Sequence, residues 1–326
     1  MGKTRAMMAG VGLALPDKIV TNDDLSKIVD TNDEWITTRT GIKQRRVSSP
    51  EEATSDLAIK ACRETLKNAG ASAEELDLIL VATTTPDSLF PSLGCMLQEM
   101  LGAKSATAFD VSAACSGFNF ALSVASSFIE QGQYKNILVV GADTLTKYVD
   151  WNDRGTCVLF GDGAGAVLLR ASTDGSGILS NYLMSNGFDG KYLVMPGGGS
   201  RDPECRNGRF IKMDGKEVFR FAVKALENTV KKALELAGLQ IGDINLLIPH
   251  QANIRIIDHA IKKLGLPKEK VYVNLERYGN TSAASIPIAL TEAAAAGRIK
   301  PGDIVALSGF GAGLTAGANI IKWKKN

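Results

Sequence analysis

An internal repeat constrains the fold of this 326-residue chain more than any other feature of its sequence. Residues 55–82 and 223–250 share a pattern of an amphipathic helix, an Ala-Gly stop and an apolar strand. The two segments are in register, with Gly70 and Gly238 168 positions apart. Glycine readily adopts the left-handed conformation that ends a helix, so both glycines are predicted helix C-caps. The repeat predicts two similar halves.

Each half carries a second helix followed by a second strand. The expected helices and strands cover residues 116–131, 136–140, 281–296 and 303–308. Cys115 and Asn280 immediately precede the two helices, so the repeat predicts that they are symmetry counterparts whose helix starts meet at a pseudo-twofold axis.

The fold class expected from these elements is α/β. Continuous apolar runs, typical of strands buried on both faces under helices, occur at residues 78–81, 137–140, 246–248 and 304–307. We expect an N-terminal half over residues 1–170 and a C-terminal half over 171–326. The stretch 171–213 is rich in Gly, Ser and Asn and predicts irregular connections that cover the site.

Composition narrows the classes of function. A formal net charge of +2 provides no global field for binding nucleic acid or a membrane surface. No apolar run reaches the roughly 20 residues of a membrane helix, and the run 7–16 is expected to be a strand rather than a signal peptide. The five cysteines form no C-x-x-C pair, so we expect no metal site, no disulfide and a reducing, cytoplasmic setting.

Two glycine-rich segments follow or precede apolar strands. The segment 160–166 lacks the Gly-Lys-Ser/Thr of a phosphate loop, and we expect a tight turn into the next strand. The segment 308–313 leaves two alternatives open, a simple turn or a loop whose backbone N–H groups approach a ligand oxyanion.

Three side chains are candidates for chemistry. Cys115 precedes a helix, whose partial positive charge is expected to lower the thiol pKa and favour a nucleophilic thiolate. His250 follows a buried strand at its carboxyl end, where ligands bind in open α/β sheets. Asn280 is suited to cap its helix and can also donate from its amide. A buried cysteine without function is the alternative for Cys115.

Five motifs together resemble the β-ketoacyl-acyl carrier protein synthase III family, ketosynthases of the thiolase superfamily. The motifs lie at residues 113–117, 160–165, 249–253, 278–285 and 309–313. The resemblance spans the chain and implies a thiolase-like, duplicated αβαβα layered fold and a homodimer. It also implies an acyltransferase that condenses an acyl-coenzyme A primer, acetyl-coenzyme A being expected, with malonyl-acyl carrier protein to initiate fatty acid synthesis.

The resemblance also implies roles for individual residues. The catalytic triad would be Cys115, His250 and Asn280, and the backbone N–H groups of Cys115 and Ala312 would form the oxyanion hole, although many relatives have glycine at position 312. No metal or redox cofactor is implied, because coenzyme A enters as a substrate thioester. The implied coenzyme A contacts are Thr31, Trp35, Arg39, Arg154 and Asn253. The implied carrier-protein docking residues are Arg220, Lys224, Arg255, Lys262 and Lys263. The implied acyl pocket comprises Leu145, Phe160, Met213 and a Phe90 lent across the dimer.

Other enzyme classes fit less well. A papain-like hydrolase would show Cys-Gly-Ser-Cys-Trp, which this chain lacks. Elongating synthases use two catalytic histidines, and chalcone-synthase-like enzymes have longer chains. Two alternatives stay open: a related ketosynthase of secondary metabolism and a non-catalytic scaffold that binds acyl-coenzyme A.

Overall fold

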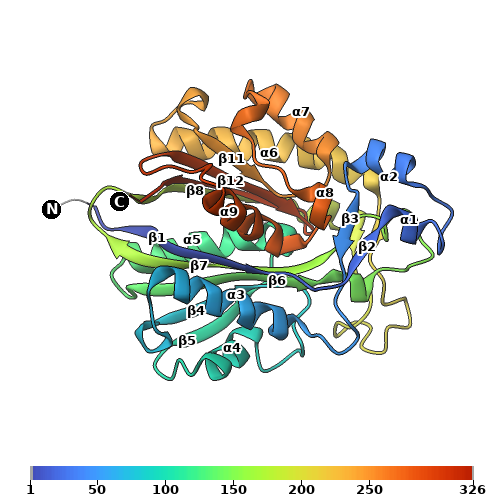
Figure 1. Ribbon diagram of the computed structural model, residues 1–326, viewed down its shortest axis with the longest axis horizontal. Helices are drawn as coiled ribbons and strands as arrows, with labels where there is room; N and C mark the ends of the chain where they lie inside the picture. Colours follow the sequence, from blue (N-terminus) through green and yellow to red (C-terminus); the bar gives the residue numbers. More distant parts are fainter. Residues whose placement is uncertain (1–2, 325–326) are drawn as a thin grey trace.

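A computed structural model describes residues 3–324 as two β-sheets separated and flanked by helices (Figure 1). The first sheet has the order β1-β7-β6-β4-β5 and the second β11-β12-β13-β8. The strands of these sheets are β1 Arg5–Ala14, β4 Leu78–Ala82, β5 Thr107–Val111, β6 Asn136–Thr144, β7 Asp162–Ser172, β8 Gly177–Ser185, β11 Leu246–Pro249, β12 Ile304–Gly311 and β13 Thr315–Lys322. The short strands are β2 Ile19–Thr21, β3 Gln44–Arg46, β9 Leu193–Val194 and β10 Lys212–Met213. The helices are α1 Asn22–Leu25, α2 Asp33–Thr40, α3 Thr54–Ala69, α4 Leu93–Leu101, α5 Gly117–Glu130, α6 Gly215–Ala237, α7 Ile254–Leu264, α8 Leu275–Tyr278 and α9 Ser285–Ala295.

The helices and sheets form five layers. Helices α5 and α9 lie between the sheets and contact both of them. Helices α3 and α4 cover the outer face of the first sheet, and α6 and α7 cover the second. The predicted αβαβα arrangement is therefore confirmed. All five residues of β4 are buried, as expected of a parallel strand covered on both faces.

The repeat seen in the sequence recurs in the sheets. Strands β4 and β11 begin 168 residues apart, as do β6 and β12. The predicted C-caps are confirmed, since Gly70 and Gly238 have φ values of 57° and 69°. Strand β5 is matched in the second sheet only by a bridge between Leu247 and Val271. Within residues 3–324, β5 forms an edge of the first sheet and has no partner strand on its outer side.

The structure corrects two sequence-based expectations. The stretch 171–213 is not irregular throughout, because β8 runs along the edge of the second sheet and pairs with β13. Gly163 and Gly165 lie within β7 rather than in a turn. A Cβ on either glycine would come within 2.8 Å of Ile288, so their small size lets α9 pack closely. The expected boundary at 170/171 falls in the last residues of β7, and the division into halves stays a prediction.

The N-terminal segment 15–48, called the cover below, packs against α7 and α8. Its buried Arg45 donates to the carbonyls of Val20 and Val158, at 3.2 and 2.8 Å. Helix α2 of this cover contacts α7, and the Asn253 amide donates to the Arg39 carbonyl at 3.0 Å. The cover thus brings α2 beside the segment that follows His250.

Candidate active site

Cys115 lies in a 3-10 turn, Ala114–Ser116, that enters α5. A matching turn, Ser282–Ala284, enters α9. Ala114 and Ser282, 168 positions apart, have φ values of 47° and 53°, a strained conformation for residues other than glycine. The counterpart of Cys115 is therefore Ala283, and the prediction that Asn280 is its symmetry mate is wrong by three positions. The reason is that α5 begins at Gly117, one residue after its expected start, whereas α9 begins at Ser285, four residues after its expected start.

The Cys115 thiol meets the opposite repeat directly. The Ser282 hydroxyl donates to Cys115 Sγ at 3.3 Å. On the other side lies Gly311, where a Cβ would come within 2.6 Å of the Cys115 nitrogen. Glycine at this position lets the end of β12 approach the backbone of the nucleophile.

Burial dominates the electrostatics of Cys115. Desolvation raises the pKa of the thiol to about 12, the hydrogen bond from Ser282 opposes this, and the buried Asp143 carboxyl adds to it. The expected lowering of the thiol pKa by the helix start is therefore not what the structure gives. The resting nucleophile is a thiol.

His250 directly follows β11 and is 1% exposed. Its Nδ1 lies 2.6 Å from the hydroxyl of Ser285, the first residue of α9. That hydroxyl also accepts from the Gln251 N–H at 3.4 Å, which frees its proton for Nδ1 and favours the tautomer with the proton on Nε2. Desolvation lowers the pKa of His250 to about 3, so the imidazole is neutral.

Asn280 is held by three hydrogen bonds. Its Oδ1 accepts from the Ser282 N–H at 2.8 Å. Its backbone N–H donates to the Leu159 carbonyl at 2.8 Å, and its carbonyl accepts from Gly161 at 3.0 Å. Because the amide oxygen is engaged, Nδ2 is the end of this side chain left to donate to a substrate.

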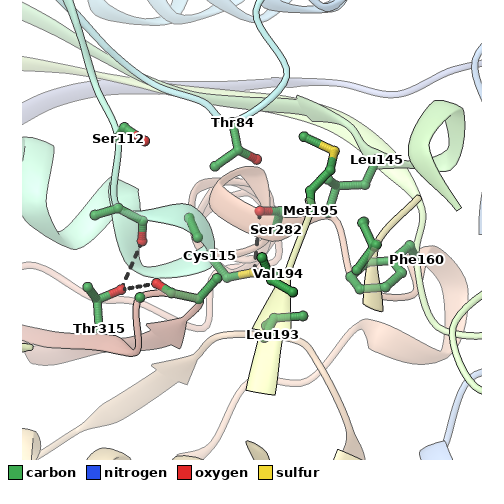
Figure 2. A pocket seen from close by; sticks show the side chains of 15 residues that line it. Thr84, Ser112, Cys115, Leu145, Phe160, Leu193, Val194, Met195, Ser282 and Thr315 are labelled. Carbon is green, nitrogen blue, oxygen red and sulfur yellow. Dashed lines mark hydrogen bonds between the residues drawn. The ribbon is translucent and has the colours of Figure 1, made fainter. Parts of the chain in front are cut away.

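Three cavities meet around these residues. Cys115, His250 and Asn280 line one cavity of about 130 Å³ with Phe310, whose ring packs edge-on against His250 at 5.1 Å. Cys115 also lines a deeper, mainly apolar pocket of about 370 Å³ (Figure 2). A third, outer cleft of about 370 Å³ shares walls with the first cavity. The shared walls of the cleft and the first cavity are Leu159, Gly215, Phe219 and Asn253. Cys115 therefore lines both the cavity that holds the triad and the apolar pocket.

Comparisons with known proteins identify the family. A family model of 3-oxoacyl-[acyl-carrier-protein] synthase III matches residues 109–187. A second model, of the C-terminal part of the same family, matches residues 234–323. A β-ketoacyl-[acyl-carrier-protein] synthase III of Caldanaerobacter subterraneus is 54% identical and covers 99% of both chains. The chain belongs to the β-ketoacyl-acyl carrier protein synthase III family. A second relative, the β-ketoacyl-[acyl-carrier-protein] synthase III of Desulfitobacterium hafniense, is 52% identical over 98% of each chain. The crystal structure of the Aquifex aeolicus 3-oxoacyl-[acyl-carrier-protein] synthase III has a TM-score of 0.93 at 49% identity, covering 98% of this chain and all of the other.

Membership of the synthase III family confirms the expected acyltransferase class and thiolase-like fold. Four of the five residues expected at coenzyme A lie at the outer cleft: Trp35, Arg39, Arg154 and Asn253. The guanidinium carbons of Arg39 and Arg154 lie 4.5 and 5.1 Å from the Trp35 ring centroid. Thr31 is not among the residues that line the cleft, although its hydroxyl is buried and has no hydrogen-bond partner among the described residues.

The expected acyl-pocket residues divide among three places. Leu145 and Phe160 line the deep pocket beside Cys115 (Figure 2). Met213 lines the adjoining cavity that holds the triad. Phe90 lines neither of these two cavities and is 84% exposed, as is the neighbouring Leu89. Ala312 lines the deep pocket together with Cys115.

The expected docking residues of the synthase III lie exposed on α6 and α7. Arg255 also lines the outer cleft, and its guanidinium lies 5.9 Å from the Phe219 ring. Arg220 is paired with Glu217 at 2.7 Å. Lys224 lies on α6, and Lys262 and Lys263 lie in the last turn of α7.

Sequence reasoning missed several groups that hold the triad. Ser282 and Ser285 stand within the motif 278–285, but only three-dimensional contact reveals that they bind Cys115 and His250. Asp143 is buried at the end of β6 and accepts from Thr84 and Ala283. A lone carboxylate after a predicted strand is the signal that could have identified it.

Residues 3–324 contain neither a metal-binding cluster nor a membrane-spanning helix. No group of three or more His, Cys, Asp or Glu residues in this part of the chain is placed to hold a metal ion. None of its helices combines the length and apolar character needed to cross a membrane.

Proposed function

We propose that this β-ketoacyl-acyl carrier protein synthase III carries an acyl group on Cys115 and uses His250 and Asn280 to condense it with malonyl-acyl carrier protein. The observation that carries the proposal is the position of Cys115, at the junction of the triad cavity and the deep apolar pocket. An acyl chain bound to this sulfur would extend into the deep pocket, while a second thioester would reach the sulfur through the triad cavity.

In the first step the Cys115 sulfur attacks the acyl carbonyl carbon. The carbon–sulfur bond to coenzyme A breaks, and coenzyme A leaves as a thiol with the proton that Cys115 gives up. The tetrahedral oxyanion is stabilised by the backbone N–H groups of Cys115 and Ala312. The Ser282 hydroxyl lowers the cost of forming the thiolate in a buried site.

In the second step the malonyl group loses CO₂ and leaves an enolate thioester. His250 Nε2–H and Asn280 Nδ2–H donate to its oxygen, and a neutral imidazole does so without attracting the departing carboxylate. The enolate carbon then attacks the acyl carbon on Cys115. The Cys115–acyl bond breaks, the released thiolate takes up a proton from solvent, and the β-ketoacyl chain remains on the carrier protein.

The entry path fits a long phosphopantetheine arm. In the outer cleft Trp35 presents an indole face to the adenine of coenzyme A, and Arg154 and Arg39 supply cations to its phosphates. For the carrier protein, the exposed cations of α6 and α7, of which Arg255 lines this cleft, complement an acidic partner. Thr31 would contact the coenzyme from the cover beside this cleft.

The acyl pocket would be completed by a second copy of the chain. Strand β5 is a sheet edge without a partner, and Phe90 and Leu89 project from the segment before α4. Pairing of two β5 edges across a twofold axis would cover this edge and bring Phe90 to the partner's pocket. We propose a cytoplasmic homodimer with acetyl-coenzyme A as its primer.

The test separates the two half-reactions. Mixing the protein with acetyl-coenzyme A should produce an acetyl adduct on the Cys115 peptide, detected by mass spectrometry, and Cys115→Ala should not produce it. His250→Ala and Asn280→Ala should still be acetylated but should release CO₂ from malonyl-acyl carrier protein at least about 100-fold more slowly, as for loss of an oxyanion donor. Full condensation by both variants would refute their assigned roles.

A further inference from the structure

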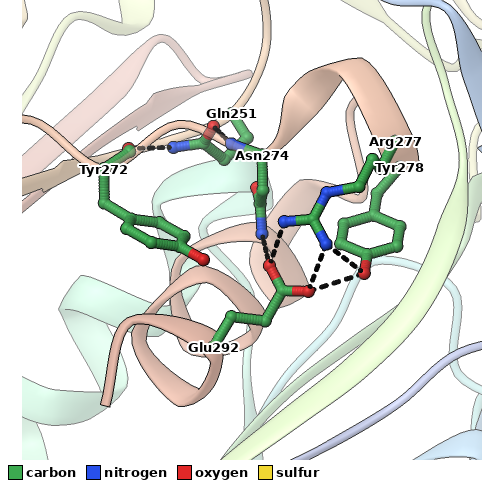
Figure 3. Close-up of polar contacts among 6 residues, drawn as sticks. All are labelled: Gln251, Tyr272, Asn274, Arg277, Tyr278 and Glu292. Atoms are coloured by element: carbon green, nitrogen blue, oxygen red, sulfur yellow. Dashed lines mark hydrogen bonds and ion pairs between the residues drawn. The ribbon is translucent and has the colours of Figure 1, made fainter. Parts of the chain in front are cut away.

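A network of polar side chains lies behind the triad, centred on Glu292 of α9 (Figure 3). Its carboxylate accepts from the Asn274 amide at 2.8 Å, from both terminal nitrogens of Arg277 at 3.0 and 2.9 Å, and from the Tyr278 hydroxyl at 2.6 Å. The Glu292 side chain is 16% exposed and that of Arg277 43%, so the carboxylate is the more enclosed partner of the ion pair. Charge-assisted hydrogen bonds of this kind are stronger than neutral ones.

The network reaches the segment that carries His250. Gln251, 1% exposed, donates to the Pro249 carbonyl at 2.7 Å and to the Tyr272 carbonyl at 3.2 Å. Its Oε1 accepts from the Asn274 N–H at 3.0 Å. The residue next to His250 is thereby joined, through Asn274, to Glu292.

The network also reaches the segment that carries Asn280. Tyr278 and Arg277 close the short helix α8, two and three residues before Asn280. Burial, followed by the hydrogen bond to Glu292, raises the pKa of Tyr278 to about 12, so its hydroxyl keeps the proton that it donates. The ion pair and the tyrosine together fix the point from which the chain turns towards Asn280.

Helix α9 connects these two contacts. Ser285 and Glu292 are seven residues apart, which is two helical turns and therefore the same face. Ser285 binds the His250 imidazole directly, while Glu292 holds the loop that leads to Asn280. One rigid element thus determines the placement of both side chains that donate to the enolate oxygen.

We infer that Glu292 is a positioning residue for the decarboxylation half-reaction, acting by fixing His250 and Asn280 at the separation that the enolate oxygen requires. The inference rests on the proposed roles of His250 and Asn280. Cys115 acylation uses the backbone N–H groups of Cys115 and Ala312, which the Glu292 network does not contact. A selective effect on one half-reaction therefore distinguishes positioning from general support of the fold.

The experiment compares Glu292→Gln, which keeps the size of the side chain and removes its charge, with Tyr278→Phe, which removes one donor. Glu75→Gln is the matched control, because Glu75 pairs with Arg170 at 3.1 Å in the other half of the molecule. Each full-length variant is assayed for single-turnover acetylation of Cys115, for CO₂ release from malonyl-acyl carrier protein, and for melting temperature. We expect Glu292→Gln to slow CO₂ release about tenfold, because that factor corresponds to the loss of one charge-assisted hydrogen bond. Tyr278→Phe should slow CO₂ release less.

Acetylation should stay within about twofold of wild type in both variants, at a melting temperature close to that of Glu75→Gln. Parallel losses in acetylation and CO₂ release would overturn the inference, since they indicate a structural role alone. Unchanged CO₂ release would overturn it as well. If Glu292→Gln does not fold, Tyr278→Phe decides by the same criteria. Normal CO₂ release by His250→Ala and Asn280→Ala would instead refute the proposed triad, an outcome distinct from failure of Glu292.

Discussion

The hydroxyl of Ser282 lies 3.3 Å from the sulfur of Cys115, although the two residues are 167 positions apart and enter different helices of the repeat. Each belongs to a 3-10 turn with a strained, left-handed first residue. The pseudo-twofold axis thus brings two irregular helix starts together. One supplies the nucleophile, and the other supplies the group that donates to it.

Removal of this donor should make the thiol harder to ionise. In Ser282→Ala the pKa of Cys115, already raised by burial, should rise further, because the hydrogen bond from Ser282 is the largest cause that lowers it. A hydrogen bond to a charged group contributes about 1.5–3 kcal/mol, so alkylation of Cys115 by iodoacetamide at pH 8 should slow about tenfold or more. The rate is followed on the Cys115 peptide, since Cys95 is exposed and can react as well. Ser126→Ala, a buried serine elsewhere on α5, should alkylate like wild type.

The approach of β12 to the nucleophile predicts a strict size limit at position 311. A Cβ in Gly311→Ala would lie 2.6 Å from the nitrogen and 3.1 Å from the Cα of Cys115, so the backbone of the turn must move. Displacing a reacting group by about 1 Å can cost about 100-fold in rate. Acetylation of Cys115 should fall by that order. In Gly242→Ala the added methyl meets open space, and acetylation at the wild-type rate is expected there.

The residues of the triad could be predicted from the sequence because each stands at the end of a recognisable strand or the start of a helix. The symmetry relation between Cys115 and the second repeat could not be predicted. Hydrophobic periodicity locates Cys115 and Asn280 before two helices, but it does not reveal the 3-10 turns that precede both helices. It therefore sets the start of α9 four residues early and that of α5 only one residue early, and the true counterpart of Cys115 is Ala283.

Two other features escaped the sequence for different physical reasons. Strand β8 mixes polar and apolar residues because it lies at a sheet edge with only its first residues deeply buried. The thiol pKa depends on enclosure by residues from both halves, which outweighs the effect of the helix start. Long-range packing, which no local pattern encodes, determines both.

The stacked arginine of the outer cleft should matter for coenzyme A alone. The Arg154 guanidinium lies 5.1 Å from the Trp35 ring, where an adenine could stack. Arg154→Ala should raise the KM for acetyl-coenzyme A about fivefold, the equivalent of about 1 kcal/mol for an exposed cation–π contact. The KM for malonyl-acyl carrier protein should not change. Arg209, stacked on Phe210 at 5.0 Å outside the three cavities, provides the matched control Arg209→Ala. Equal KM increases in both variants would contradict a specific role for Arg154.

The buried, neutral His250 predicts how stability responds to acid. Its pKa falls to about 3 in the folded protein, below the ordinary value of 6.5. Between pH 3 and pH 6.5, His250 is protonated in the unfolded chain but not in the folded protein. This residue therefore lowers the free energy of unfolding as the pH falls below about 6.5, by up to about 1.4 kcal/mol per pH unit. The carboxyls of Asp143 and Asp162, whose pKa values are raised by burial, act in the opposite direction, so the comparison must be between variants.

Urea unfolding at pH 7 and pH 4.5 should show a smaller loss of stability for His250→Gln than for wild type. The exposed His259→Gln should lose as much as wild type, and an identical loss in all three proteins would mean that His250 is not held neutral by burial.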